Sequence, residues 1–142
     1  MMTSGLLCAT DGSAISEKAV VYAVELARSQ QQHLAFLTVI AGAEEQHPMV
    51  WDEKRLRAGD LPAERELLSA LSVATQQDVQ HLTCIRVHGR SAAAAIVSYA
   101  EKNNYHHIIA GSAGLTGAKR LLLGSVAADI VALAHCPVTI VR

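Results

Sequence analysis

The stretch "GLLCATDGSAISEKAVVYAVELA", residues 5–27, joins an apolar run to a polar turn and then to a longer amphipathic run. Residues 5–10 carry no charge, which is typical of a strand buried on both faces. Asp11-Gly12-Ser13 forms the turn, and Ser13 is predicted to cap a helix. The apolar positions of this helix recur three and four apart, at Ile15, Ala19, Tyr22, Ala23, Leu26 and Ala27. The stretch therefore predicts a buried strand followed by a helix that packs on the sheet.

The alternation of strand and helix continues along the chain. Further strands are predicted at residues 33–40, 79–88 and 105–110 and at Val138 to Val141. Residues 41–59 are less regular and charged, and they contain Met49-Val50-Trp51, which we expect to pack against the sheet edge.

Three more helices are predicted from their start signals. The first begins at Asp60, with Pro62 just after it, and Ser91 caps an alanine-rich second helix. Ser125 is predicted to cap the third, which Pro137 ends. The apolar positions are Leu67, Leu68 and Leu71 in the first helix, and Val126, Ile130, Leu133 and Ala134 in the third.

This pattern predicts an α/β fold, with a single domain over residues 1–142. We expect a doubly wound, five-stranded parallel sheet in the order 3-2-1-4-5, with helices on both faces. Ligands bind such sheets at the carboxyl ends of the strands, where the winding reverses. Here the reversal falls between the first and fourth strands, so the turn at 11–13 and the loop after residue 110 face one crevice.

The composition narrows the class of protein. The chain is 51% hydrophobic but only 4% aromatic, and its net charge of -1 gives no case for a nucleic-acid or membrane partner. Cys8, Cys84 and Cys136 form no close-spaced pair, which favours reduced thiols over disulfides or zinc. No signal peptide or membrane span is recognisable, so we expect a soluble cytoplasmic protein.

The loop "GSAGLTGAKRLLLGS", residues 111–125, is the best candidate for a ligand site. Its glycines can leave backbone amides open, and Gly124-Ser125 lies at a predicted helix N-terminus, which favours an anion. Further hydroxyl and cationic groups that can bind phosphate are Ser112, Thr116, Ser125, Lys119 and Arg120. Neither the Walker-type loop nor the dinucleotide fingerprint is present.

The spacing Gly111-x2-Gly114-x9-Gly124-Ser125 resembles that of the nucleotide-binding universal stress proteins. Residues 10–13, 38–40 and 136–142 also resemble that family's start, second strand and end. The resemblance implies that ATP binds at the crevice, with Asp11 at the ribose or adenine, Val39 at the adenine and the loop glycines around the phosphates. The nucleotide site so predicted comprises Ala9, Thr10, Asp11, Val39, Ala110, Gly111, Ser112, Gly114, Gly124, Ser125 and Val126.

Two departures from the family pattern leave the ligand open. Ala9 stands where the family often has proline, and Leu115 where it often has arginine. ATP, ADP, AMP and cyclic nucleotides all remain candidates, with or without Mg²⁺. We expect a regulatory role in the stress response, with no catalytic residue and at most slow ATP hydrolysis. The alternative is a nucleotide-free interaction module that regulates a partner protein. In either case the resemblance implies a homodimer through the uncovered edge strand at Val138 to Val141.

Other sites are less well supported. Ser112 could be a hydrolase nucleophile, but Asp129 and His135 lie on or just after one helix and cannot line up behind it. His106 and His107 are adjacent on a predicted strand, so they point to opposite faces and cannot share a metal. His47, His81 and His88 have no evident partners and are expected at the surface.

Overall fold

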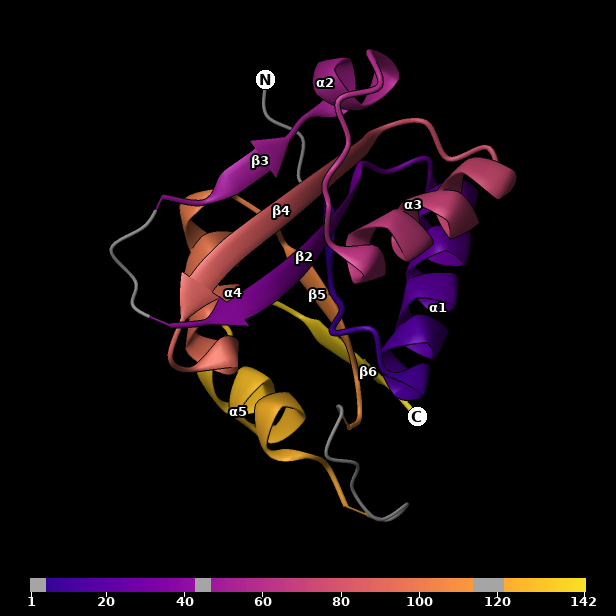
Figure 1. Ribbon diagram of the computed structural model, residues 1–142. Coiled ribbons are helices and arrows are strands. Elements are labelled where there is room, and N and C mark those ends of the chain that lie inside the picture. Colours follow the sequence, from indigo (N-terminus) through magenta and orange to yellow (C-terminus); the bar gives the residue numbers. More distant parts are fainter. Residues whose placement is uncertain (1–4, 43–46, 114–121) are drawn as a thin grey trace.

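The computed structural model describes residues 5–42, 47–113 and 122–142, which form a central six-stranded sheet (Figure 1). The strands are β1 (Leu6–Ala9), β2 (Leu34–Ala41), β3 (Met49–Trp51), β4 (Leu82–Gly89), β5 (His107–Gly111) and β6 (Val138–Val141). They lie in the order β3-β4-β2-β1-β5-β6. All strands except β3 run parallel, as expected where helices connect them across both faces.

The expectation of a five-stranded, wholly parallel sheet is wrong, because β3 adds an antiparallel strand at the outer edge of β4. Trp51 of β3 lies opposite Cys84 and is 5% exposed. The guanidinium groups of Arg55 and Arg86 lie 5.6 and 5.7 Å from its ring centroid. Burial of this large side chain holds residues 49–51 in the sheet. The prediction that they pack at the sheet edge is confirmed, although three residues are too few to show a strand pattern.

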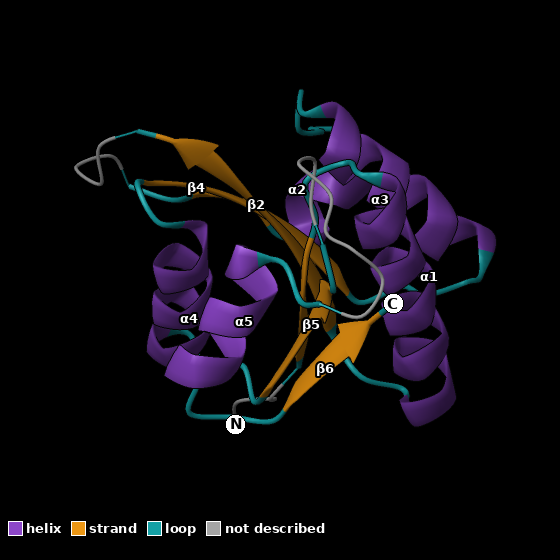
Figure 2. Ribbon diagram, turned by 90° about the horizontal axis from the view of Figure 1, so that it is seen from below, coloured by secondary structure: helices purple, strands orange, loops and turns teal. Residues whose placement is uncertain are grey.

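Helices cover both faces of this sheet in the part of the chain described. They are α1 (Ala14–Gln30), α2 (Glu53–Arg57), α3 (Arg65–Gln76), α4 (Ala92–Lys102) and α5 (Ser125–Leu133). Figure 2 shows α1 and α3 on one face and α4 and α5 on the other. The carboxyl ends of the parallel strands therefore lie between two layers of helices.

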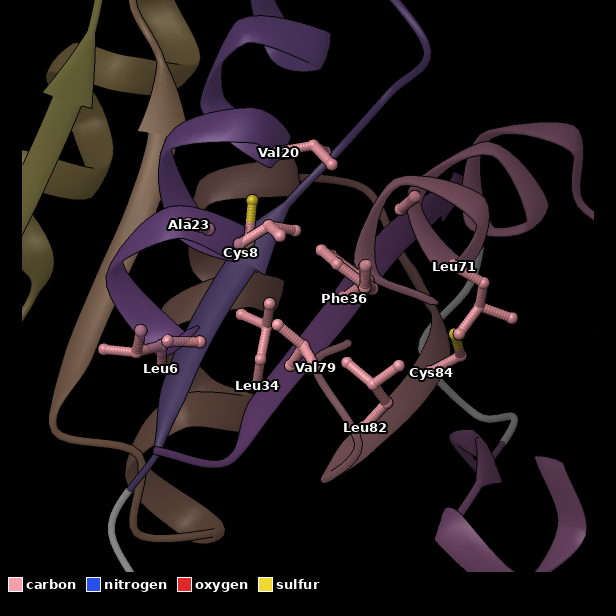
Figure 3. Packing of buried hydrophobic residues seen from close by; sticks show 14 of the residues in the cluster. Leu6, Cys8, Val20, Ala23, Leu34, Phe36, Leu71, Val79, Leu82 and Cys84 are labelled. Atoms are coloured by element: carbon pink, nitrogen blue, oxygen red, sulfur yellow. The ribbon is translucent and has the colours of Figure 1, made fainter. Parts of the chain in front are cut away.

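Two apolar clusters fill the space between the sheet and these layers. Successive residues of one strand point to opposite clusters: Leu6 and Cys8 pack toward α1 and α3, and Leu7 toward α4 and α5. Figure 3 shows the first cluster, where Leu34 and Phe36 of β2 lie beside Leu6 and Cys8 of β1. Side chains buried on both faces explain why these strands are apolar throughout rather than alternating.

Two of the predicted helix caps are confirmed. The side chain of Ser13 accepts a hydrogen bond from the Ser16 amide at the start of α1. The side chain of Ser91 accepts one from the Ala94 amide at the start of α4. Each bond satisfies one of the backbone donors that a helix start leaves unpaired.

The other two predicted starts are wrong. Helix α3 begins after Glu64 instead of at Asp60, whose carboxylate lies 2.7 Å from Nε of Arg55. The cap of α5 is Gly124, and Ser125 is its first helical residue, with no side-chain hydrogen bond at the cap. Four side chains predicted to be buried are exposed: Tyr22, Leu68, Val126 and Leu133.

The expectation of free cysteine thiols is confirmed. Cys8 and Cys84 are buried, Cys136 is partly exposed, and all three are free of disulfide bonds. Burial raises the pKa of both Cys8 and Cys84 to about 12, so these thiols stay protonated at neutral pH. Among the described residues, no helix has the length and apolar character needed to cross a membrane.

Candidate functional site

A cavity of about 320 Å³ opens at the carboxyl ends of β1, β2 and β5. It lies between the turn that follows β1 and the start of α5, which is the crevice that the sequence predicts. Its walls divide into an apolar face, a hydroxyl-bearing turn and a helix N-terminus.

The apolar face is made by strand ends and by one side of α4 and α5. Its residues are Leu37, Val39, Ala92, Ile96, Ala110 and Ile130. The second apolar cluster continues behind them, so this face is backed by a packed core. Such a face suits the flat, weakly polar surface of an aromatic ring.

The turn after β1 supplies the polar wall, with Thr10, Asp11 and Ser16. Oδ1 of Asp11 accepts a hydrogen bond from the Ser13 amide at 2.9 Å, which orders the turn. Gly12 has a φ of +83°, a left-handed conformation that favours glycine at this position. The turn and the first turn of α1 therefore bring one carboxylate-bearing residue and two hydroxyl-bearing residues to this wall.

The start of α5 forms the third wall, through Gly124, Ser125, Val126 and Ala127. Within the described ranges, the amides of Ser125, Val126 and Ala127 donate to no backbone carbonyl, and no side chain caps them. The first intrahelical bond runs from the Ala128 amide to the Gly124 carbonyl, at 3.0 Å. Unpaired amides and the positive end of the helix dipole give this wall an affinity for anions.

The prediction that the loop amides are generally open is wrong for Ser112 and Gly124. The Ser112 amide donates to the Val141 carbonyl at 2.8 Å, and the Gly124 amide donates to the Ser112 carbonyl at 2.7 Å. These bonds fix the two ends of the loop to the protein instead of facing a ligand. Among the described residues, the amides at the loop end that donate to no backbone carbonyl are those one to three residues further on, at the start of α5.

Close packing, and not ligand access, accounts for two of the glycines. A Cβ atom at position 111 would lie 2.8 Å from Cγ2 of Ile15 and 3.2 Å from its carbonyl carbon. A Cβ atom at position 124 would lie 3.3 Å from the Cα atom of Ala113. A side chain at position 111 would force Ile15 to shift, and one at position 124 would make a contact tighter than side chains normally make, so both positions favour glycine for steric reasons.

Most of the predicted nucleotide site is brought together. The residues of the predicted site that line the cavity are Ala9, Thr10, Asp11, Val39, Ala110, Gly111, Gly124, Ser125 and Val126. Ser112 is buried and does not line it, and Gly114, Leu115, Thr116, Gly117, Lys119 and Arg120 lie outside the described residues. Sequence reasoning missed Ser16, Leu37, Ala92, Ile96, Ala113, Ala127 and Ile130. Of these, Ser16 had a signal, since it lies in the first turn of the helix that Ser13 caps.

The structure does not support the hydrolase triad or the histidine metal site among the described residues. Ser112 is 8% exposed, and Nε2 of His135 lies 3.6 Å from the Glu101 carboxylate, so the residues of the hydrolase hypothesis do not meet. Nε2 of His107 is 2.7 Å from Oγ1 of Thr139. Within residues 5–42, 47–113 and 122–142, no cluster of three or more candidate metal ligands exists.

Two histidine predictions require a correction: His81 is exposed as predicted but has a partner, and His88 is not fully at the surface. Nδ1 of His81 lies 3.2 Å from the Glu53 carboxylate, so His81 has a partner. His88 is partly buried at the end of β4. His47 is exposed, as predicted.

A larger groove of about 710 Å³ lies elsewhere, beside α2, α3 and the start of β4. Its walls include Leu56, Leu61, Leu68 and Leu71, and its Arg57 is already paired with Glu53 at 2.6 Å. It lies at the amino edge of the parallel strands, away from the α5 N-terminus. Its size therefore does not make it the better anion site.

Comparison with known proteins decides the family. A sequence model of the universal stress protein family matches residues 2–142. The chain belongs to this family. Universal stress protein YxiE of Bacillus subtilis is 33% identical over 153 aligned positions, which cover 99% of this chain and 100% of YxiE.

Solved universal stress proteins share the fold. One, solved in complex with cAMP, has a TM-score of 0.74 and 24% identity, over 100% of this chain and 99% of that one. Another, from Archaeoglobus fulgidus in complex with dAMP, has a TM-score of 0.69 and 21% identity, over 100% of both chains. At these identities the likeness establishes the fold alone.

Proposed function

We propose that this universal stress protein binds an adenine nucleotide in the 320 Å³ cavity. The observation that carries the proposal is the pairing of an apolar face with the N-terminus of α5 across one cavity, where no described side chain or backbone carbonyl caps the first amides. The first suits a base and the second a phosphate. The cAMP and dAMP complexes of two structural relatives support an adenine nucleotide as the ligand.

We propose that the nucleotide acts as a regulatory signal in the stress response and is at most slowly hydrolysed. Among the described residues that line the cavity, Asp11 is the one ionisable side chain. Its carboxylate already orders the turn through the Ser13 amide. Fast hydrolysis of ATP needs groups that position water and stabilise developing charge, beyond a single turn-forming carboxylate. ATP, ADP, AMP and cyclic AMP remain candidates, with or without Mg²⁺.

Calorimetric titration of the purified protein tests this proposal. We expect AMP to bind more tightly than adenosine, because its phosphate reaches the amides of Ser125 and Val126. ATP, ADP and cyclic AMP in parallel titrations identify the preferred phosphate arrangement. If no adenine nucleotide binds at millimolar concentration, the proposal fails and a nucleotide-free interaction module that regulates a partner protein becomes the better description.

We also propose a cytoplasmic homodimer formed through β6, which lies at one end of the sheet. The Ile108 amide donates to the Pro137 carbonyl at 3.1 Å, and the Ser112 amide to the Val141 carbonyl at 2.8 Å. The N–H and C=O of one residue point to the same side of a strand, and the side alternates between residues, so those of Val138 and Ile140 face away from β5. Outward donors and acceptors of this kind are a template for a second β6. The free thiols of the chain suit a reducing compartment.

A further inference from the structure

The groove of about 710 Å³ beside α2 and α3 shares no lining residue with the proposed nucleotide cavity. Its volume falls in the range of about 300–1,000 Å³ that is usual for small-molecule sites. Two of its leucines reach solvent, since Leu61 is 51% exposed and Leu68 is 38% exposed. The apolar residues that line it are Leu56, Leu61, Leu68, Leu71, Val79 and Leu82. The groove therefore offers an apolar surface that a ligand of this size can bury.

The charged side chains that line this groove leave one negative charge uncompensated. Oε1 of Glu53 lies 2.6 Å from Nη2 of Arg57, and Oε2 lies 3.2 Å from Nδ1 of His81, so both oxygens of Glu53 are engaged. Asp78 is the third charged residue of the lining. In the part of the chain that the structure describes, no hydrogen bond or ion pair engages its side chain. Its carboxylate is therefore available to a cation.

The end of α3 adds to the negative charge at this side of the groove. Asp78 comes directly after Gln77, the residue that caps α3, and Thr75 in the last turn of the helix also lines the groove. That last turn carries no basic residue, so the negative end of the helix dipole is not offset from within the helix. Nη1 of Arg28 donates to Oε1 of Gln77 at 3.0 Å, but Arg28 does not line the groove. A cation beside Asp78 is attracted by the carboxylate and by the helix end together.

We propose that this groove binds a small apolar amine, with its ammonium group at Asp78 and its hydrocarbon body against Leu61 and Leu68. The leucines favour an apolar body, and the unpaired carboxylate at the end of α3 selects a positive head group over a neutral or negative one. This second site is independent of the nucleotide cavity, so it stands or falls apart from the proposed function.

The test uses three probes that have the same eight-carbon chain and differ in head group: octylammonium, 1-octanol and octanoate. Calorimetric titration of the full chain, below the concentration at which the probes form micelles, measures each affinity. We expect octylammonium to bind about threefold more tightly than octanol and about tenfold more tightly than octanoate, as a partly exposed charge pair allows. Backbone NMR shifts should place the bound chain at Leu68, Thr75 and Asp78.

Two variants separate the head group from the body of the ligand. Asp78→Asn removes the charge, and it should fold because asparagine tolerates the φ of +60° at this position as aspartate does. It should bring the affinities for octylammonium and octanol to within about twofold of each other. Leu68→Ala should weaken all three probes by a common factor of about fivefold, because it removes apolar surface.

Matched controls lie on α5, on the opposite face of the sheet (Figure 2). Asp129→Asn removes the same charge and Leu133→Ala the same exposed side chain, and neither residue lines the groove. Both variants should bind the three probes as wild type does. A control that reproduces the effect of its partner variant contradicts the assignment, because the effect would then be general to the protein surface.

Other outcomes also overturn the inference. They are the absence of saturable binding, equal affinity for the three probes, and an amine preference that survives in Asp78→Asn. Tighter binding of octanoate would show that the remaining N–H donors of Arg57 govern the groove instead. If Leu68→Ala dissociates a wild-type dimer in light scattering, a second copy of the chain covers the groove and leaves no room for an amine. None of these results bears on AMP binding, which a parallel titration measures.

Discussion

Replacement of Ser125 by proline tests the α5 anion site by removing one backbone donor. Ser125 is the first helical residue of α5, a position where proline is well tolerated because its amide has no intrahelical partner. The preceding residue, Gly124, has φ and ψ of −64° and 162°, which is compatible with a following proline. Ser125→Pro should therefore fold, and its free energy of unfolding should equal that of wild type or exceed it by up to about 1 kcal/mol.

The effect on ligand binding should be much larger. A hydrogen bond to a charged group contributes about 1.5–3 kcal/mol, and each 1.4 kcal/mol changes an equilibrium constant about tenfold. Losing the Ser125 amide should therefore weaken AMP by about ten- to a hundredfold. Adenosine lacks the phosphate, so its affinity should be unchanged.

Calorimetric titration with AMP and adenosine measures both quantities, and thermal unfolding without ligand reports the stability. Ser125→Ala is the matched control, because it deletes the hydroxyl but keeps the amide. The reasoning is refuted if Ser125→Pro is folded and binds AMP as tightly as wild type. It is also refuted if Ser125→Ala weakens AMP as much as the proline does, since the hydroxyl would then be the donor.

Three further predictions concern packing, acid stability and assembly. Gly111→Ala should cost about 1–3 kcal/mol of unfolding free energy through its contact with Ile15, and less in an Ile15→Ala background; additive costs in a denaturant double-mutant cycle would contradict this. Burial alone raises the pKa of Glu64, but the hydrogen bond and charge of Arg86 outweigh burial, so the net pKa is lowered. The unfolded chain therefore binds more protons than the folded chain, and the free energy of unfolding falls as the pH drops below about 4.5. Glu64→Gln should lose about 1–2 kcal/mol at pH 7, with the difference from wild type shrinking below that pH, whereas Asp60→Asn, in an exposed pair, should change stability by less than about 0.5 kcal/mol; an equal effect of both in urea titrations would rule out the assignment. Ile140→Pro removes an outward amide of β6 and should convert the proposed dimer to a monomer, as measured by light scattering at micromolar concentration. A monomeric wild type under the same conditions would contradict the proposed dimer.

The pattern of residues predicted most of the helices and strands, because strands buried on both faces require long apolar runs and helices packed on a sheet require apolar residues three and four apart. It failed for β3, which is held by Trp51 against β4 and its neighbouring arginines and not by a local pattern. It also placed the start of α3 at Asp60, a good capping residue, because the competing partner Arg55 is visible only in the folded chain. Both errors come from interactions between segments that local sequence does not encode.

The sequence by itself determined the family, the βα alternation, and the two segments that line the cavity, namely the turn after β1 and the start of α5. It could do so because turns and helix starts depend on neighbouring residues, as with Asp11, Gly12 and Ser13. Only the tertiary structure decided which groups of the cavity are available to a ligand. The Ser112 amide donates to the Val141 carbonyl, and the Gly124 amide donates to the Ser112 carbonyl, so neither amide is available to a ligand. A donor's availability depends on every acceptor within reach, and those acceptors come from parts of the chain far apart in sequence.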